Sequence, residues 1–367
     1  MPVDWSAVRA EFPALQNWTF LNTATFGQTP ARSKAAIDRH FARRDELACH
    51  DFLDWFDDMD ELRRRIGQLL TCDASSIAFL PNASSALSLL LGRLEWKTGD
   101  QIVTLADEFP NHYYYPAWLR RHGVELIETP FEKFWDALTP RTRLVACSTM
   151  NYATGFRPPL EAMSAELRRR GILLYLDGTQ GIAALDYNLA RIRPAMFAVN
   201  GYKWLLSPPG AAFFWIDDEL RERLDPLCFG WRSDAGWKSV EALNHGEPVL
   251  EDSAAKYENG MLAFPSLYGM SESIAMVLEL GMEAIEARVL HLAAAVTEVL
   301  RERGGVICHA ATPIVAAHFE DRDPGEMAAA LRPRGILVAA RHGYLRVSPH
   351  FYNNEEDVER LRVGLGI

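Results

Sequence analysis

The sequence is poor in cysteine and in positive charge, and both shortages exclude classes of protein. Its 367 residues include five widely spaced cysteines and no Cys-x-x-Cys pair. An odd number at such spacing argues against a disulfide framework and against a structural zinc site. Asp and Glu total 49 against 38 Lys and Arg, which gives a net charge of -11. Since a nucleic-acid binder needs a basic surface, we expect no nucleic-acid partner.

The sequence also lacks a long apolar run. The chain opens Met1-Pro2-Val3-Asp4 with neither a basic stretch nor an apolar stretch, so no signal peptide is predicted. Residues 74–92 carry no charge, but this window contains Pro81, Asn82 and five serines. A strand, a turn and a buried helix explain it better than a membrane span. We therefore expect a cytoplasmic protein with no membrane partner.

Several common catalytic motifs are missing. The chain has no Gly-x-x-x-x-Gly-Lys phosphate loop, no Gly-x-Gly-x-x-Gly fingerprint and no His-Glu-x-x-His pair. Its ten histidines show no metal-ligand spacing. No metal site is therefore expected.

What the sequence does contain is a regular alternation of short apolar runs and helical patterns. Helices are predicted over residues 84–94, 116–122 and 160–170. Strands are predicted over residues 76–80, 101–105, 124–129, 143–149, 172–176, 197–199 and 211–216. Such an alternation is typical of an α/β protein with a largely parallel sheet covered on both faces.

The length suggests two or three domains at roughly 100–200 residues each, or one large domain with an appendage. The C-terminal part of the chain has a different pattern from the rest. A long helical stretch over residues 266–303 is followed by short strands and two further helices. These strands are expected over residues 305–308, 314–319, 336–339 and 344–348, and the helices over residues 324–331 and 355–365. We predict an N-terminal segment at residues 1–30, a large domain at 31–245 and a small α+β domain at 246–367.

Polar residues follow several strands of the predicted large sheet, where ligands of such sheets bind. Ser84 and Ser85 enter a helix, which is an anion-binding arrangement. Phe109 follows the next strand and is able to stack on a planar ligand. Asp177 ends a buried strand, where a carboxylate needs a cationic partner. Lys203 lies between apolar residues, and burial lowers the pKa of such an amine.

Each of these signals is weak alone, because the serines also suit an ordinary helix N-cap and the phenylalanine a core position. Together they provide an anion cradle, a stacking aromatic, a buried acid and a buried lysine at one edge of a sheet. Pyridoxal phosphate (PLP) requires this set: the lysine forms a Schiff base, and the acid keeps the pyridine nitrogen protonated so that the ring withdraws electrons.

Three stretches carry a family resemblance. They are residues 20–27 (Phe-Leu-Asn-Thr-Ala-Thr-Phe-Gly), residues 177–180 with 201–205, and residues 345–353 (Leu-Arg-Val-Ser-Pro-His-Phe-Tyr-Asn). The sequence resembles the class V aminotransferases of fold-type I, which include cysteine desulfurases, kynureninases and isopenicillin N epimerase-like proteins. The resemblance covers nearly the whole chain. It implies the PLP-dependent transferase fold, with a mostly parallel seven-stranded sheet in the large domain.

The resemblance also implies roles for individual residues. Lys203 would form the Schiff base and carry the α-proton, Asp177 would pair with the pyridinium nitrogen, and Arg346 would bind the substrate α-carboxylate, since a guanidinium grips a carboxylate bidentately. Further cofactor contacts are implied for Ala83, Ser84, Ser85, Phe109, Asn151, Gln180, Asn200, Tyr202 and Trp231. Further substrate contacts are implied for Asn22, Ala24 and Thr25.

Three positions depart from the family pattern or stay open. Asn200 stands where many members have Ser or Thr as a phosphate ligand. Met261, which cannot donate a hydrogen bond, stands where members often supply a threonine across a dimer. Trp231 suits a cofactor contact and a core or dimer-interface position equally well. Arg341 and His342, shortly before Arg346, are candidates to line the substrate pocket.

The resemblance implies an enzyme that acts on a small amino acid as a homodimer, first of all an aminotransferase. The alternative is a PLP-dependent lyase or epimerase. A catalytically silent PLP-fold protein is disfavoured by the intact Lys203, Asp177 and Arg346. Cysteine desulfurases place a nucleophilic cysteine on a loop before the arginine, but residues 336–344 contain no cysteine. We therefore expect no persulfide-type desulfurase, and expect Cys308, on a predicted strand, to be structural.

Overall fold

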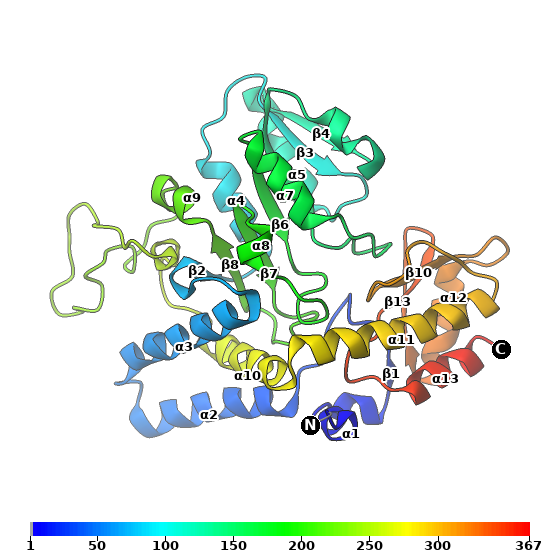
Figure 1. Cartoon of the computed structure of the whole chain (residues 1–367). Coiled ribbons are helices and arrows are strands. Elements are labelled where there is room, and N and C mark those ends of the chain that lie inside the picture. The colour runs from blue at the N-terminus through cyan, green and yellow to red at the C-terminus, as the bar shows by residue number, and fades with distance from the viewer. Residues whose placement is uncertain (1–2) are drawn as a thin grey trace.

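The computed structural model describes residues 3–367, and its central feature is a seven-stranded sheet (Figure 1). The strand order is β2-β8-β7-β6-β5-β3-β4. All neighbours are parallel except β8, which runs antiparallel to β2 and β7. The strands are β2 (Ile77–Leu80), β3 (Gln101–Leu105), β4 (Glu125–Thr129), β5 (Thr142–Ser148), β6 (Leu173–Asp177), β7 (Met196–Asn200) and β8 (Ala212–Ile216). The predicted mostly parallel seven-stranded sheet is confirmed.

Helices cover both faces of this sheet because side chains of its buried strands alternate between two cores. In β5, Val145 and Cys147 face one core, and Leu144 and Ala146 face the other. The first core includes α3 (Phe52–Leu70), α7 (Leu160–Arg169), α8 (Leu189–Ile192) and α10 (Phe264–Leu280). The second includes α4 (Ala83–Arg93) and α9 (Asp218–Arg223). Two shorter helices are α5 (Asn111–Trp118) and α6 (Phe134–Ala137).

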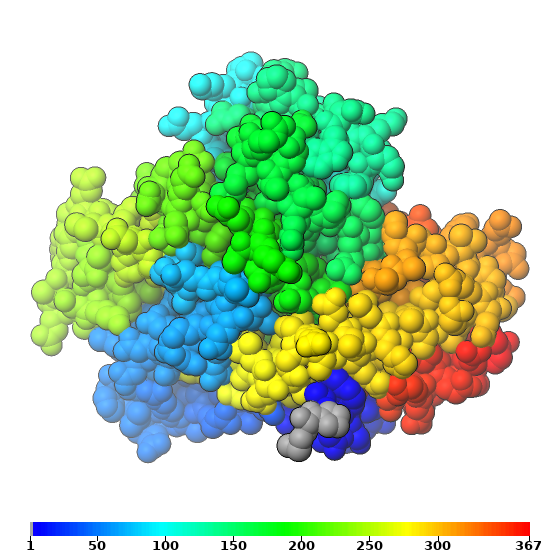
Figure 2. Space-filling model, viewed as in Figure 1, coloured from blue at the N-terminus to red at the C-terminus, as the bar shows by residue number. Residues whose placement is uncertain are grey.

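The long helical stretch of the C-terminal half is two helices. It divides at Gly281, whose positive φ of 81° suits glycine, into α10 and α11 (Met282–Glu302). Helix α10 packs on α2 (Ala31–Leu47) and α3 beside the large sheet, and α11 passes on to the C-terminal lobe (Figures 1 and 2). The division of the chain at residues 30 and 245 stays a prediction.

The C-terminal lobe is built on a four-stranded antiparallel sheet, of order β12-β13-β10-β9. Its strands are β9 (Val306–Ile307), β10 (Val315–His318), β12 (Ala339–Arg341) and β13 (Tyr344–Val347), and its other helices are α12 (Pro324–Leu331) and α13 (Glu355–Gly364). The predicted small α+β part is confirmed. The strand expected at residues 336–339 is split, because β11 (Ile336–Leu337) pairs instead with β1 (Thr19–Phe20).

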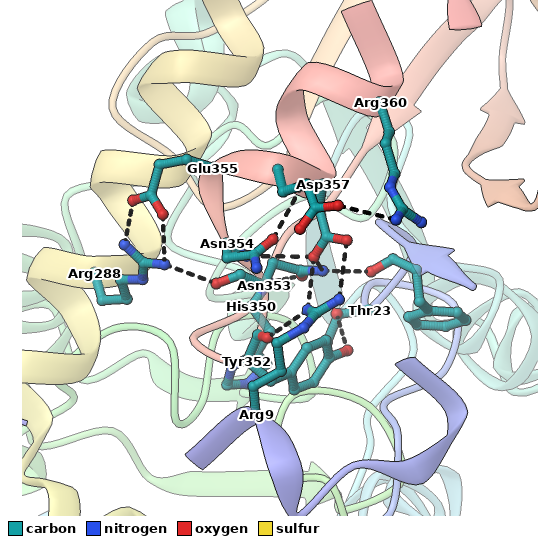
Figure 3. A network of polar contacts seen from close by, with 12 residues as sticks. Arg9, Thr23, Arg288, His350, Tyr352, Asn353, Asn354, Glu355, Asp357 and Arg360 are labelled. Carbon is teal, nitrogen blue, oxygen red and sulfur yellow. Dashed lines mark hydrogen bonds and ion pairs between the residues drawn. The ribbon is translucent and has the colours of Figure 1, made fainter. Parts of the chain in front are cut away.

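A polar network fixes the two ends of the chain together (Figure 3). Arg9, in α1 (Trp5–Ala10), binds Asp357 and the carbonyl oxygen of Tyr352. The Tyr352 hydroxyl lies 2.7 Å from that of Thr23, and Asn353 donates to the carbonyl oxygen of Phe20. The segments 20–27 and 345–353, both singled out in the sequence, are therefore neighbours in space.

One helix begins earlier than its pattern predicts. Helix α5 begins at Asn111 and is followed by a 3-10 turn, Leu119–His122, in place of one helix over residues 116–122. Pro116, which was expected at the start of the helix, lies inside it. No helix among residues 3–367 is both long enough and apolar enough to cross a membrane.

Candidate active site

The carboxyl ends of β6 and β7 bring Asp177 close to the loop that carries Lys203. The two strands are parallel neighbours, with Asp177 opposite Ala198. Asp177 is buried, and its Oδ1 accepts from the backbone N–H of Thr179 at 2.9 Å. Burial lowers the pKa of Lys203 to about 8, although the negative charge of Asp177 acts to raise it. A pKa of about 8 leaves roughly a tenth of the molecules with a neutral amine at pH 7, far more than an ordinary lysine does.

Aromatic side chains flank the lysine. Its Nζ lies 5.5 Å from the ring centre of Phe109 and 5.8 Å from that of Tyr202. Phe109 is 39% exposed although it is large and apolar, so part of its ring is open to a ligand. This arrangement fits a planar group held between Phe109 and the strand ends.

Arg346, on β13 of the C-terminal lobe, is only 1% exposed. It donates from Nη1 to the carbonyl oxygen of Tyr152 at 2.6 Å, and from Nη2 to Thr25 Oγ1 at 2.5 Å and Asn22 Oδ1 at 3.3 Å. Its Nε has no partner among the described residues. Burial, and secondly Arg341, lower the pKa of Arg346 to about 9. The guanidinium stays charged at neutral pH but contacts only neutral acceptors.

The N-terminus of α4 forms the expected anion cradle, but only part of it is free. The backbone N–H of Ala83 donates to Oδ1 of Asn200 at 3.0 Å. Both the N–H and the hydroxyl of Ser85 donate to the N-cap residue Asn82. Of the three predicted phosphate contacts, Ser84 is the one left with an uncommitted N–H, since the first N–H groups of a helix have no partner within the helix.

The side-chain amide of Gln180 is held by hydrogen bonds at both its nitrogen and its oxygen. Its Nε2 donates to the carbonyl oxygen of Ala24 at 3.0 Å, and its Oε1 accepts from Nε1 of Trp204 at 2.6 Å. Trp204 directly follows Lys203. Gln180 therefore links the loop of residues 22–27, which holds the substrate-side residues Asn22, Ala24 and Thr25, to the lysine loop.

Asn151 and Trp231 are held by contacts within the chain, and their cofactor contacts stay predictions. The Oδ1 of Asn151 accepts from the backbone N–H of Ala153 and Thr154, and its Nδ2 donates to the carbonyl oxygen of Asp107. This side chain holds its own loop. Trp231 packs against Phe56 and Trp237, at ring distances of 6.1 and 5.6 Å, so within one chain its contacts are those of a core residue.

Sequence reasoning missed Tyr152, which directly follows Asn151. Its ring packs edge-on to Phe109 at 5.4 Å, and its hydroxyl lies 2.5 Å from Nε2 of His342. His342 had been singled out as a candidate for the substrate pocket. The missed signal was a single aromatic in the polar turn after β5. The pair provides a proton donor and acceptor beside Phe109 that is separate from Lys203.

A second missed group is the buried pair of Glu108 and His112. Nδ1 of His112 lies 3.3 Å from Oε2 of Glu108. The same carboxylate accepts from the backbone N–H of Ser148 at Oε1 and from the Ser148 hydroxyl at Oε2. Although burial acts to raise it, the pKa of Glu108 is lowered by His112 and Ser148. Burial opposes the ionised imidazole, but Glu108 and then Asp177 raise the pKa of His112. The pair therefore adds to the charge pattern around Asp177.

The residues present fit PLP on several independent observations. The site has an amine with a lowered pKa, a carboxylate at the end of a strand, a partly exposed aromatic, and an anion cradle. Arg346, a buried guanidinium without an anionic partner, lies near enough for its charge to act on Lys203. Ser84 would hold the phosphate, Asp177 the pyridine nitrogen and Phe109 the ring.

Comparisons with known proteins identify the family and the fold. The family model of class V aminotransferases matches residues 50–361. Isopenicillin N epimerase of Streptomyces clavuligerus is 27% identical over 98% of this chain and 96% of that protein. A probable cysteine desulfurase of Methanothermobacter thermautotrophicus is 23% identical over 96% and 95%. The structure of a C-DES variant with glycine covalently linked to its PLP cofactor superimposes with a TM-score of 0.90, at 21% identity, over 97% of this chain and 98% of that one.

The match covers most of the chain and confirms the family expected from the sequence motifs. The chain therefore belongs to the class V aminotransferase family of PLP-dependent enzymes.

Proposed function

We propose that this protein binds PLP through Lys203 and acts on the α-carbon of an amino acid, with transfer of the amino group as its reaction. The observation that carries the proposal is the pair formed by Lys203, with its lowered pKa, and Arg346, buried without an anionic partner. One group is suited to covalent attachment and proton transfer, and the other to a carboxylate. When bound, PLP supplies an aldehyde that condenses with amines and a pyridinium ring that withdraws electrons from the α-carbon.

The side chains of this chain supply the rest. Arg346 binds the α-carboxylate and so orients the Cα–H bond of the substrate. Nζ of Lys203, neutral in part at pH 7, removes the α-proton and returns it. Asp177 keeps a proton on the pyridine nitrogen by its negative charge. Phe109 covers one ring face and excludes water from it.

A second candidate function is a lyase or an epimerase, and one observation favours it. The hydroxyl of Tyr152 and Nε2 of His342 are hydrogen-bonded beside Phe109. An epimerase needs two groups that exchange protons with the α-carbon, and a lyase needs an acid for its leaving group. Isopenicillin N epimerase is among the relatives, and C-DES is described as a cystine C–S lyase. The Tyr152–His342 pair is the candidate for either task.

Persulfide-type desulfuration is not part of the proposal, although some relatives are named probable cysteine desulfurases. The β12–β13 hairpin turns through His342 and Gly343 and contains no cysteine. Cys308 is half-buried, and burial raises the pKa of its thiol, which disfavours the thiolate that a nucleophile needs.

The test is to incubate the PLP-loaded protein with a panel of amino acids in the absence of a keto acid. The proposal expects pyridoxamine phosphate and one equivalent of keto acid per site. Steady release of pyruvate together with ammonia, or of alanine, would instead assign a lyase. Inversion of the amino acid at its α-carbon, measured by chiral chromatography, without formation of pyridoxamine phosphate would assign an epimerase. Tyr152→Phe should suppress the last two reactions much more than the first.

A further inference from the structure

Two arginines share one face of the β12–β13 hairpin. Ala339 lies opposite Arg346, and Arg341 lies opposite Tyr344. Because paired residues share a face and faces alternate along a strand, Arg341 and Arg346 are on the same side of the hairpin. Both guanidinium groups reach the hydroxyl oxygen of Thr25, Arg346 at 2.5 Å and Arg341 at 3.4 Å. Two positive charges therefore converge on one point of the site.

Neither arginine has an anionic partner. Arg341 donates only to the carbonyl oxygen of Ala340 and to Thr25, and Arg346 only to neutral oxygens. No ion pair within residues 3–367 includes either of them. Elsewhere this protein pairs its buried arginines: Arg63 and Arg232 both bind Glu258, at 2.5 and 2.7 Å. Two adjacent cations without a counter-ion are costly, so the ligand is the expected source of negative charge.

One α-carboxylate neutralises only one of these charges. The other predicted ligand groups have their own sites, so they do not neutralise the second arginine. Asp177, whose charge acts on Lys203, is assigned to the pyridine nitrogen, and Ser84, at the start of α4, to the phosphate. We propose that Arg341 binds a second carboxylate, carried by the side chain of the substrate, and that the substrate is an amino dicarboxylic acid. This inference rests on the proposed function, in which Arg346 binds the α-carboxylate.

The difference in burial between the two arginines indicates how the substrate would be oriented in the site. Arg346 is almost fully buried, whereas Arg341 is half-buried and its neighbour His342 is exposed. The α-carboxylate would therefore lie deep in the site and the side-chain carboxylate nearer its mouth. The other titratable groups here are His342 and Tyr152, whose hydrogen bond to each other borders the same space.

The test measures binding rather than turnover, so that it does not depend on the reaction catalysed. The PLP-loaded protein is titrated in a calorimeter with glutarate and adipate, and with the monocarboxylates valerate and hexanoate. These probes have no amino group and cannot react. A charge-assisted hydrogen bond to Arg341 should make the dicarboxylates bind roughly 10- to 100-fold more tightly than the monocarboxylates.

Variants then assign this preference to one residue. Arg341→Gln should bring the ratio to within about threefold of unity and leave monocarboxylate binding unchanged, because Arg346 is intact. Arg341→Lys should keep part of the preference, since a point charge lacks the planar fork. Arg322→Gln is the matched control: it removes an exposed arginine of the same lobe that has no ion pair within residues 3–367, and should change neither constant.

Two results would overturn the inference. One is equal binding of dicarboxylates and monocarboxylates to the unmodified protein. The other is an equal weakening of both by Arg341→Gln, which would show that the two arginines grip a single carboxylate. The absorption of bound PLP reports whether each variant is folded and loaded. If Arg341→Gln does not bind PLP, the dicarboxylate preference of Arg341→Lys is used in its place. A protein that takes up no PLP on Lys203 would contradict the proposed function, whereas normal uptake without the dicarboxylate preference would contradict this inference alone.

Discussion

Nε2 of His350 lies 2.8 Å from the carbonyl oxygen of Trp204, the residue after Lys203. Nδ1 of the same ring accepts from the backbone N–H of Phe351. The imidazole is therefore neutral, with its proton on Nε2. A residue of the C-terminal lobe thus holds the loop of the large sheet that carries the candidate catalytic lysine.

This relationship predicts an acid-sensitive fold. Burial lowers the pKa of His350 from 6.5 to about 3. As pH falls below 6.5 the unfolded chain takes up a proton here and the native protein does not, so the free energy of unfolding should fall by up to about 1.4 kcal/mol per pH unit until about pH 3. Urea denaturation at pH 7 and pH 5 measures this. His350→Gln, which can still donate to Trp204, should lose that part of the pH dependence; an unchanged slope would show that other groups cause it.

Asp177→Asn should impair PLP chemistry far more than folding. Asparagine keeps the shape and the contact with Thr179 but loses the charge that holds a proton on the pyridine nitrogen. We expect a loss of roughly 100-fold or more in turnover, the size usual for a lost electrostatic contact to the reacting group, with little change in the thermal midpoint of the apoprotein. Near-normal turnover would refute this role.

Arg346→Ala should impair substrate capture and leave PLP uptake largely intact. Its guanidinium is the buried cation that faces the site, and removing it should cost roughly 2–5 kcal/mol in kcat/KM for every amino-acid substrate. A substrate analogue without a carboxylate should be little affected. Wild-type efficiency on amino acids would mean that Arg341 holds the α-carboxylate.

A homodimer is predicted from the family resemblance and from an apolar surface. The segment between α9 and α10 carries exposed side chains of Leu227, Phe229, Val240, Val249 and Met261, and it extends away from the body in Figure 1. Exposed apolar residues gathered on one segment favour an interaction surface. Sedimentation equilibrium at assay concentration should give twice the chain mass. A fully active monomer would contradict it.

The sheet and the closeness of Asp177 to the Lys203 loop could be predicted because they follow from local patterns, whereas the role of Arg346, on an antiparallel strand, followed from the family resemblance. Apolar runs defined the strands, and parallel strands end at one edge. The direction of the Asn151 side chain could not be predicted, since it depends on how the loop presents the N–H groups of Ala153 and Thr154. The shared face of Arg341 and Arg346 depends on the register of a hairpin that the sequence pattern had merged with another strand.

The central claim is that Lys203 is the attachment point of PLP, and one measurement tests it directly. The protein is loaded with PLP, reduced with borohydride, digested and mapped by mass spectrometry, with the buried Lys256 as the internal comparison. The account predicts a yellow protein and a single adduct on Lys203, absent from Lys203→Ala. An adduct on another lysine, or a colourless protein that PLP cannot reconstitute, would contradict it.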